Sequence, residues 1–249
     1  MSLLNEETRR KLRELNLSEM IEAIDQQAQD IGYSSMPFED RMKMAIDFVH
    51  QKKYNSMVDR LMKSAKFRIA NASFHNIYYI DRGLDKEKLL NLSTAQFIDS
   101  SSNIVFHGFT GSGKSYLACA LGRQACMQGI RTQYIRTPDL LMLRDEATLT
   151  PQGLSKLLKK FTSYKLLILD EWLLDDLSEE EQHFLFELIE RRHDTSSTIF
   201  CTQFKKEDWH VRLGGGVHAD AMMDRIVHNA AWVFTGNLNM RQFYSKNQN

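Results

Sequence analysis

The first quarter of the chain carries apolar residues at the three- and four-residue spacing of amphipathic helices. Leu12, Ile21 and Ile24 follow this spacing before a break that ends in Pro37. Proline fits the first turn of a helix, so we expect a further helix over residues 38–64. The pattern therefore predicts a small all-helical N-terminal domain over residues 1–68.

A different pattern begins after residue 102, where short apolar runs alternate with helical segments. The strand candidates are 103–107, 132–135, 166–169, 198–201 and 231–234. Strands separated by helical segments predict a parallel sheet with helices on both faces, which makes residues 103–249 an α/β core. Residues 69–102 form the connection to this core, with a short helix near 85–90.

Two helix starts in the core have recognisable capping residues. Thr137 is expected to cap a helix whose first residue is Pro138. Ser178 and Glu181 form a capping box, which opens a helix that we expect to end near His193.

The composition is that of a globular protein. Of 249 residues, 43% are hydrophobic and 26% charged. The 32 basic and 32 acidic residues balance, so contact with nucleic acid requires a local basic face. The 3 cysteines include no CxxC pair, which argues against a disulfide framework or a cysteine-built zinc site. Without a visible apolar leader or membrane span, we expect a cytoplasmic protein with no membrane partner.

The strongest motif follows the first strand candidate and matches G-x-x-x-x-G-K-[ST] without a gap. Glycines let several backbone N–H groups converge on one anion, and the positive end of the following helix adds to their attraction. The lysine reaches the β- and γ-phosphates of a nucleotide, and the final serine binds Mg²⁺. The predicted ATP-binding residues here are Gly108, Phe109, Thr110, Gly111, Ser112, Gly113, Lys114, Ser115 and the adjoining Tyr116.

A second motif is the acidic pair Asp170-Glu171 after the apolar run 166–169. A carboxylate at the end of a buried strand is costly unless a cation pairs with it. We therefore assign Asp170 to the Mg²⁺ side of the nucleotide, through water, and Glu171 to the attacking water. An Asp-Glu pair alone is more typical of a surface turn, but here it follows a buried strand and a phosphate loop.

Three later polar residues are ambiguous by themselves. Gln203 follows a strand candidate, where it could contact the γ-phosphate or serve as an ordinary loop amide. Arg225 has Asp224 beside it, which suggests a surface ion pair, and Arg241 near the C-terminus could be solvated.

The ordered motifs nevertheless resemble those of one family, the IstB-like ATPases. These are AAA+ helper proteins encoded by a class of bacterial insertion sequences, and they are related to DnaC-type helicase loaders. The resemblance spans nearly the whole chain. It rests on GFTGSGKS, LLILDE, CTQFKKEDWH, HADAMMDRIVHNA and NMRQ, together with LNLSEMIEAI and PFEDRMKMAIDF in the helical part.

The resemblance implies an AAA+ P-loop NTPase core that hydrolyses ATP at a subunit interface of a homo-oligomer. Lys114 and Glu171 then act in catalysis with Gln203 at the sensor-1 position, where relatives commonly carry Asn. Arg225 matches the arginine that reaches the nucleotide of a neighbouring subunit, and Arg241 matches sensor 2. The resemblance also implies non-specific binding to duplex DNA and control of a partner transposase.

DNA contact would be made with phosphates, since no base-reading motif is visible. A basic strip at the end of the helix predicted over 38–64 could provide it, or could be a solvated helix face; its residues are Lys52, Lys53, Arg60, Lys63, Lys66 and Arg68. A second candidate group, just before the third strand, consists of Lys156, Lys159 and Lys160.

Two other functions stay open. A helicase loader would bind single strands and a replicative helicase, and the N-terminal helices would decide between the two partners. A small-molecule kinase would transfer phosphate to a metabolite, but such an enzyme needs no water-activating carboxylate at Glu171, which argues against it.

Overall fold

The computed structural model describes residues 4–80 and 82–246. The chain divides into two compact units, Met1–Arg60 and Leu61–Asn249. Helix α3, Phe38–Ala65, begins in the first unit and ends in the second, in agreement with the helix predicted over 38–64. No helix in the described part of the chain is long and apolar enough to cross a membrane.

The first unit is helical. It contains α1 (Glu6–Glu14), α2 (Ser18–Gln29), a 3-10 turn η1 (Ile31–Ser35) and most of α3. Asn5 caps α1 because its Oδ1 accepts a hydrogen bond from the backbone N–H of Thr8 at 2.8 Å. Ile21 and Ala23 of α2 are buried, as are Ala45 and Val49 of α3.

Within the described residues of the second unit, five parallel strands form one sheet in the order β2-β3-β4-β1-β5. The strands are β1 (Asn103–His107), β2 (Thr132–Arg136), β3 (Leu166–Asp170), β4 (Ser197–Thr202) and β5 (Ala230–Phe234). Each predicted strand is present, with its ends shifted by at most one residue. The α/β prediction is confirmed.

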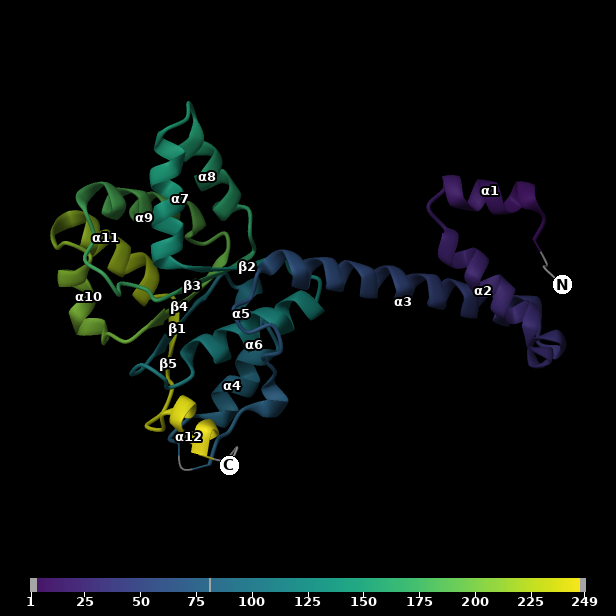
Figure 1. The fold of residues 1–249 in the computed structure, drawn as a ribbon, viewed down its shortest axis with the longest axis horizontal. Helices are drawn as coiled ribbons and strands as arrows, with labels where there is room; N and C mark the ends of the chain where they lie inside the picture. The colour runs from purple at the N-terminus through teal and green to yellow at the C-terminus, as the bar shows by residue number, and fades with distance from the viewer. Residues whose placement is uncertain (1–3, 81, 247–249) are drawn as a thin grey trace. The chain divides into compact units, whose positions relative to one another are not determined.

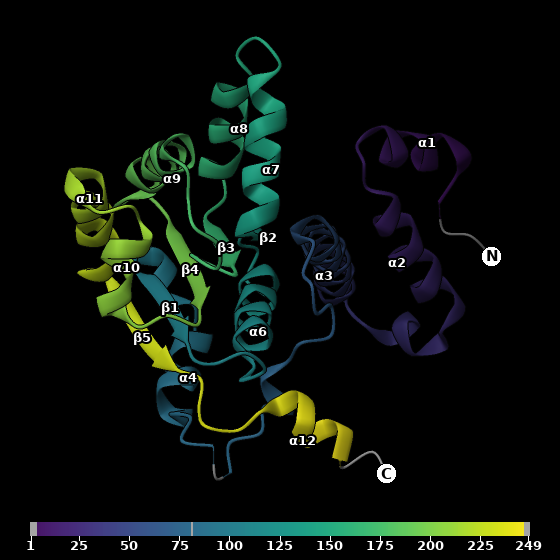
Figure 2. The same cartoon turned by 60° about the vertical axis from the view of Figure 1, so that its left-hand side comes forward.

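Helices cover both faces of this sheet (Figures 1 and 2). The short 3-10 turn η2 (Phe74–Asn76), α4 (Lys86–Ser93), α5 (Gln96–Asp99) and α6 (Lys114–Met127) belong to one side. The opposite face packs against α7 (Thr137–Thr148), α8 (Gly153–Thr162), α9 (Glu179–Arg192), α10 (Lys206–Arg212) and α11 (Gly216–Val227). The last element is α12 (Met240–Lys246).

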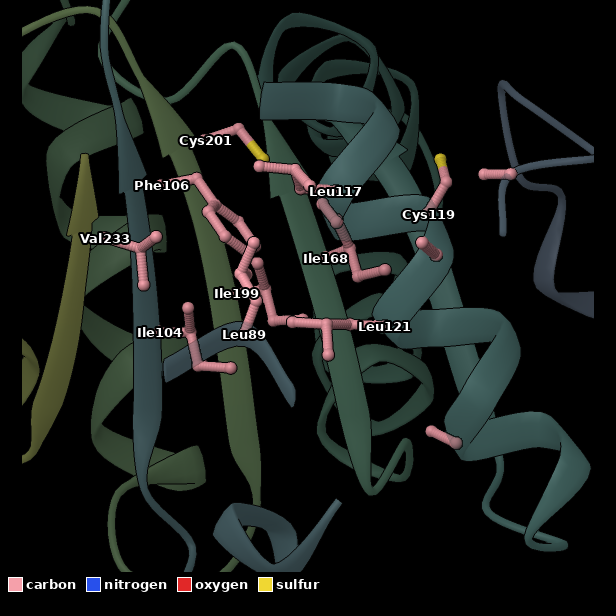
Figure 3. Packing of buried hydrophobic residues seen from close by; sticks show 14 of the residues in the cluster. Leu89, Ile104, Phe106, Leu117, Cys119, Leu121, Ile168, Ile199, Cys201 and Val233 are labelled. Atoms are coloured by element: carbon pink, nitrogen blue, oxygen red, sulfur yellow. The ribbon is translucent and has the colours of Figure 1, made fainter. Parts of the chain in front are cut away.

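Strands β3 and β4 are buried along their whole length and β1 is buried in its middle, because successive side chains enter cores on opposite faces of the sheet. Ile104 and Phe106 of β1 pack towards α6, whereas Val105 between them belongs to the opposite core. Figure 3 shows Phe106, Ile168 and Ile199 facing the α6 side chains Leu117 and Leu121. Leu89 and Ile98, which lie in the segment predicted as a connection, are buried in the same core.

The two predicted helix starts have different outcomes. The capping box of Ser178 and Glu181 opens α9 as expected. The prediction that Thr137 caps α7 is wrong, since Thr137 is the first helical residue and Arg136 occupies the cap position. Arg136 also ends β2 and keeps an extended backbone, so α7 follows the strand directly.

Candidate active site

The sheet order brings the predicted site residues together at the carboxyl ends of the strands. Strand β4 lies between β3 and β1, so the segments that follow these three strands emerge side by side. These segments carry the phosphate loop, the acidic pair and Gln203. They line a pocket of about 480 Å³, which we call the nucleotide pocket.

The phosphate loop turns through glycines with left-handed backbones. Gly111 has φ +90° and Gly113 has φ +93°. A Cβ atom at Gly111 would lie 2.6 Å from Asn239 Oδ1, so a side chain there would displace Asn239 and strain the left-handed backbone. Lys114 Nζ donates hydrogen bonds to the carbonyl groups of Gly108 at 2.6 Å and Phe109 at 2.9 Å. Burial lowers the pKa of Lys114.

A buried arginine fixes the outside of this loop. Arg82 donates hydrogen bonds to the carbonyl groups of Thr235, Tyr78 and Ser112. The hydroxyl groups of Ser112 and Thr235 are also hydrogen bonded, 2.6 Å apart. Met240 at the start of α12 donates its backbone N–H to the carbonyl of Gly111 at 2.9 Å. The loop therefore depends on residues far away in the sequence.

Asp170 is 1% exposed at the end of β3, and both of its oxygens have hydrogen-bond donors. Tyr134 Oη donates to Asp170 Oδ2 at 2.6 Å, and the backbone N–H of Glu171 donates to Oδ1 at 2.9 Å. Burial and the Asp170 charge raise the pKa of Tyr134, which keeps it a donor. These bonds fix the carboxylate at the edge of the pocket.

Glu171 is paired with two arginines. Its Oε1 lies 3.2 Å from Arg68 Nη1, and its Oε2 lies 2.7 Å from Arg136 Nη2. Burial alone would raise the pKa of Glu171, but the two guanidinium groups lower it below the ordinary value. The Glu171 backbone is left-handed, with φ +57°. The carboxylate is thus ionised and held by side chains of its own chain.

The predicted residues that line the nucleotide pocket are Thr110, Gly111, Gly113, Lys114, Ser115, Tyr116, Asp170, Glu171, Gln203 and Arg241. Gln203 Oε1 accepts a hydrogen bond from the Thr110 hydroxyl at 3.1 Å, which ties it to the phosphate loop. Gly108, Phe109 and Ser112 belong to the same loop but are not among the residues that line the pocket. Arg225 is not among the lining residues, and its Nη2 lies 3.2 Å from Glu190 Oε1.

The basic candidates for DNA contact differ in their surroundings. Lys52 Nζ lies 3.1 Å from Glu22 Oε1, and Lys53 donates to the carbonyl of Asn16 at 2.8 Å. Arg68 lies against the acidic pair, and Lys160 lines a separate pocket with Lys66. The exposed residues among the candidates include Arg60, Lys63, Lys156 and Lys159.

The sequence prediction missed Arg82, Tyr134 and Arg136. Arg136 faces Asp170 in the register of β2 and β3. An arginine at the end of a strand candidate is a weak signal, because the sequence does not tell which strand lies beside it. Nothing in the segment around Arg82 marks it as a partner of a loop 30 residues away.

The pocket suits a magnesium nucleotide. Beside the phosphate loop it is lined by apolar and aromatic side chains, Ile69, Ile77, Tyr78, Met240 and Tyr244, on which a purine base could pack. Asp170 is held in place by its two donors and lines the same pocket as Ser115, and oxygen donors of this kind are those that Mg²⁺ prefers.

A five-stranded parallel sheet in the described chain, with this loop after β1 and the acidic pair at the end of β3, defines an AAA+ P-loop NTPase fold. The chain belongs to the IstB-like ATP binding protein family, whose profile matches residues 10–248.

Relatives in bacterial insertion sequences are similar over most of their length. The putative insertion sequence ATP-binding protein y4pL of Sinorhizobium fredii is 30% identical over 224 residues, which cover 88% of this chain and 89% of the relative. The IS1162 putative ATP-binding protein of Pseudomonas fluorescens is 32% identical, and the match covers 81% and 87% of the two chains.

Solved structures share the fold. A DnaC helicase loader superposes with a TM-score of 0.55 at 22% identity, covering 66% of this chain and 96% of that one. The AMPPCP-bound DnaA of Aquifex aeolicus gives a TM-score of 0.59 at 19% identity, covering 74% and 56%.

Proposed function

We propose that this chain is an ATPase that assembles on duplex DNA and activates or directs the transposase of an insertion sequence. The observation that carries the proposal is the nucleotide pocket, where Lys114, Asp170, Glu171 and Gln203 come from three strand ends to one cavity. The family membership and the insertion-sequence relatives support the transposition role.

The residues of the pocket divide the chemistry among them. The loop amides and Lys114 bind the β- and γ-phosphates. To make this contact, the ammonium group of Lys114 gives up its hydrogen bonds to the carbonyls of Gly108 and Phe109. Mg²⁺, held by Ser115 and through water by Asp170, would neutralise phosphate charge. Glu171, once released by its arginines, accepts a proton from the attacking water. Gln203 orients that water or the γ-phosphate.

Two arginines connect hydrolysis to assembly. Arg241 lines the pocket of its own chain, as a sensor-2 residue should. Arg225 lies outside that pocket, which fits an arginine that acts on the nucleotide of a neighbouring copy in a homo-oligomer. Because the phosphates of ATP would complete the contact between two copies, assembly would depend on ATP.

In this proposal the protein contacts the phosphates of the DNA backbone. Residues 1–68 are the part of the chain that contacts DNA or the transposase. A replication initiator DnaA with this fold binds single-stranded DNA together with AMPPCP, which supports nucleic-acid binding here. The DnaC likeness keeps a helicase loader as the second candidate, one that would prefer single strands to duplex.

The Glu171→Gln variant tests both parts of the proposal. It should bind ATP as tightly as wild type but hydrolyse it at least about 100-fold more slowly, because the water loses its base. It should also accumulate as ATP-bound assemblies on duplex DNA in a mobility-shift assay. Glu87→Gln, an exposed change on α4, serves as the control.

Normal turnover by the Glu171→Gln variant would remove the water-activating role. Failure of the ATP-bound variant to assemble on duplex would refute the DNA part, and assembly on single strands alone would favour the helicase loader.

A further inference from the structure

The turn that carries Glu171, residues 171–174, has an unusual backbone. Glu171 has φ +57° and Leu173 has φ +59°, left-handed values that residues with a side chain rarely adopt. The backbone N–H of Leu174 closes the turn by donating to the carbonyl of Glu171 at 3.2 Å. Such a backbone persists only where the surrounding structure holds it, so the contacts of this turn bear directly on the site that it lines.

The sheet holds the inner side of the turn. The backbone N–H of Trp172 donates to the carbonyl of Cys201 in β4 at 2.8 Å. The Trp172 ring is fully buried, and its centroid lies 4.9 Å from that of Phe200 and 6.1 Å from that of Trp209. The turn is therefore fixed to β4 and to α10 on this side.

The outer side of the turn is held by Arg212, the last residue of α10. Its Nε donates to the carbonyl of Leu173 at 2.6 Å, and its Nη2 donates to the carbonyl of Leu174 at 2.8 Å. Within residues 4–80 and 82–246, neither carbonyl has another hydrogen-bond donor. The planar guanidinium spans two neighbouring carbonyls at once, which the single ammonium of a lysine does not do as well.

The same guanidinium lies on the ring of Phe204, with its Cζ 4.0 Å from the ring centroid. Phe204 directly follows Gln203, and its backbone N–H donates to Thr202 Oγ1 at the end of β4 at 3.2 Å. One side chain thus contacts both the turn after β3 and the segment after β4. Glu171 and Gln203, which these two segments carry, line the nucleotide pocket together.

Arg212 extends from a well-anchored helix end. Trp209, one turn earlier in α10, is fully buried, and its ring centroid lies 5.3 Å from that of Trp232 in β5. The next residue after the helix, Leu213, is also buried and donates its N–H to the carbonyl of Trp209 at 2.8 Å. Arg212 is not among the residues that line the nucleotide pocket, so any effect on hydrolysis passes through the segments it contacts.

We propose that Arg212 is a positioning residue for ATP hydrolysis, which holds Glu171 and Gln203 so that both face the same water molecule. This role rests on the proposed function, in which Glu171 activates that water. The phosphate loop is supported by other contacts, those of Arg82 and of α12, so ATP binding does not depend on Arg212.

The first test separates turnover from binding in the full chain. Arg212→Gln should lower kcat at least about tenfold, because a small displacement of groups that orient water is costly, and should leave ATP affinity within about twofold of wild type. Arg131→Gln is the matched control. It removes a guanidinium that lies 4.4 Å from the Tyr164 ring centroid, outside the nucleotide pocket, and should change neither quantity more than about twofold.

Arg212→Lys is the second variant, and it carries the test if Arg212→Gln does not fold. It keeps a cation beside Phe204 but loses the paired hold on the two carbonyls, so kcat should fall at least about threefold with ATP affinity unchanged. Wild-type turnover in the lysine variant would overturn the proposal. A loss of ATP affinity as large as the loss of kcat would overturn it too.

A double-mutant comparison distinguishes positioning from a general loss of structure. In a Glu171→Gln/Gln203→Ala background both positioned groups are gone, so adding Arg212→Gln should lower single-turnover hydrolysis by less than about a further twofold. If Glu171→Gln alone hydrolyses ATP normally, the proposed function has failed. If that variant is slow but Arg212→Gln costs the same factor in both backgrounds, the proposed function stands and the positioning role of Arg212 is refuted.

Discussion

Arg82 is 3% exposed and connects three segments that meet behind the phosphate loop. Its guanidinium donates to the carbonyl groups of Tyr78, Ser112 and Thr235. Burial lowers the pKa of Arg82, although the tyrosines Tyr79 and Tyr244 oppose this shift. Since the carbonyl partners are themselves buried or part-buried, they lose their donors if the side chain is removed.

We therefore predict that Arg82→Ala lowers the free energy of unfolding by about 3 kcal/mol, because buried carbonyl groups are left unpaired. It should also weaken ATP binding, since the loop loses its outer support. Urea unfolding and calorimetric titration measure the two effects. Arg131→Ala, at an exposed position with a hydrogen bond to Ser163, should cost less than about 1 kcal/mol. Equal losses in the two variants would contradict the role of Arg82.

At the scale of elements, the start of α9 is set by a local sequence signal. Ser178 Oγ accepts from the backbone N–H of Glu181 at 3.3 Å, and Glu181 Oε2 accepts from the backbone N–H of Ser178 at 2.7 Å. The buried side chains Leu185 and Leu188 of this helix pack in the core on one face of the sheet. The cap thus holds the helix where its apolar side meets the strands.

Ser178→Ala should lower the free energy of unfolding by about 1 kcal/mol, because an N–H at the helix start loses its acceptor. Chemical denaturation followed by circular dichroism measures the change. Ser155→Ala, on the exposed side of α8, should be neutral or slightly stabilising, since alanine favours the helix. A loss no larger at Ser178 than at Ser155 would show that the capping box adds nothing to stability.

Elements whose signals are local could be predicted, and elements whose positions depend on distant contacts could not. The strands, the capping box and the phosphate loop each carry their signal within a few residues. Arg136 was missed as a partner of Glu171 because that contact requires β2 beside β3. A threonine before proline fits a helix cap, but the strand continues through Arg136 and the helix starts directly after it, at Thr137.

At the scale of the whole molecule, the proposed function places Arg225 between two copies of the chain. Arg225 lies on α11 and contacts Glu190 of α9 and the carbonyl of Ala221. It does not line the nucleotide pocket of its own chain, whereas Arg241 does. Under the proposed function, Arg225 acts on the ATP of a neighbouring copy.

Arg225→Ala should leave the ATP affinity of the isolated chain within about twofold of wild type but lower hydrolysis by about 10³-fold under assembly conditions. Light scattering and phosphate release would follow assembly and turnover together. Arg191→Ala, which removes an exposed ion pair with Glu187 on α9, is the matched control and should keep most of the activity. Loss of turnover in a strictly monomeric preparation would contradict a role between subunits.

The central claim is that a magnesium nucleotide binds in the nucleotide pocket, against the loop that ends in Lys114 and Ser115. Isothermal titration of the full chain with ATP and Mg²⁺ tests it directly, with the Lys114→Ala variant titrated in parallel. We predict one ATP bound per chain by the wild type, and affinity at least about 100-fold weaker in the variant, because the charge-assisted contact to the phosphates is lost. No heat of binding with the wild type, or equal affinity in the two proteins, would contradict the claim.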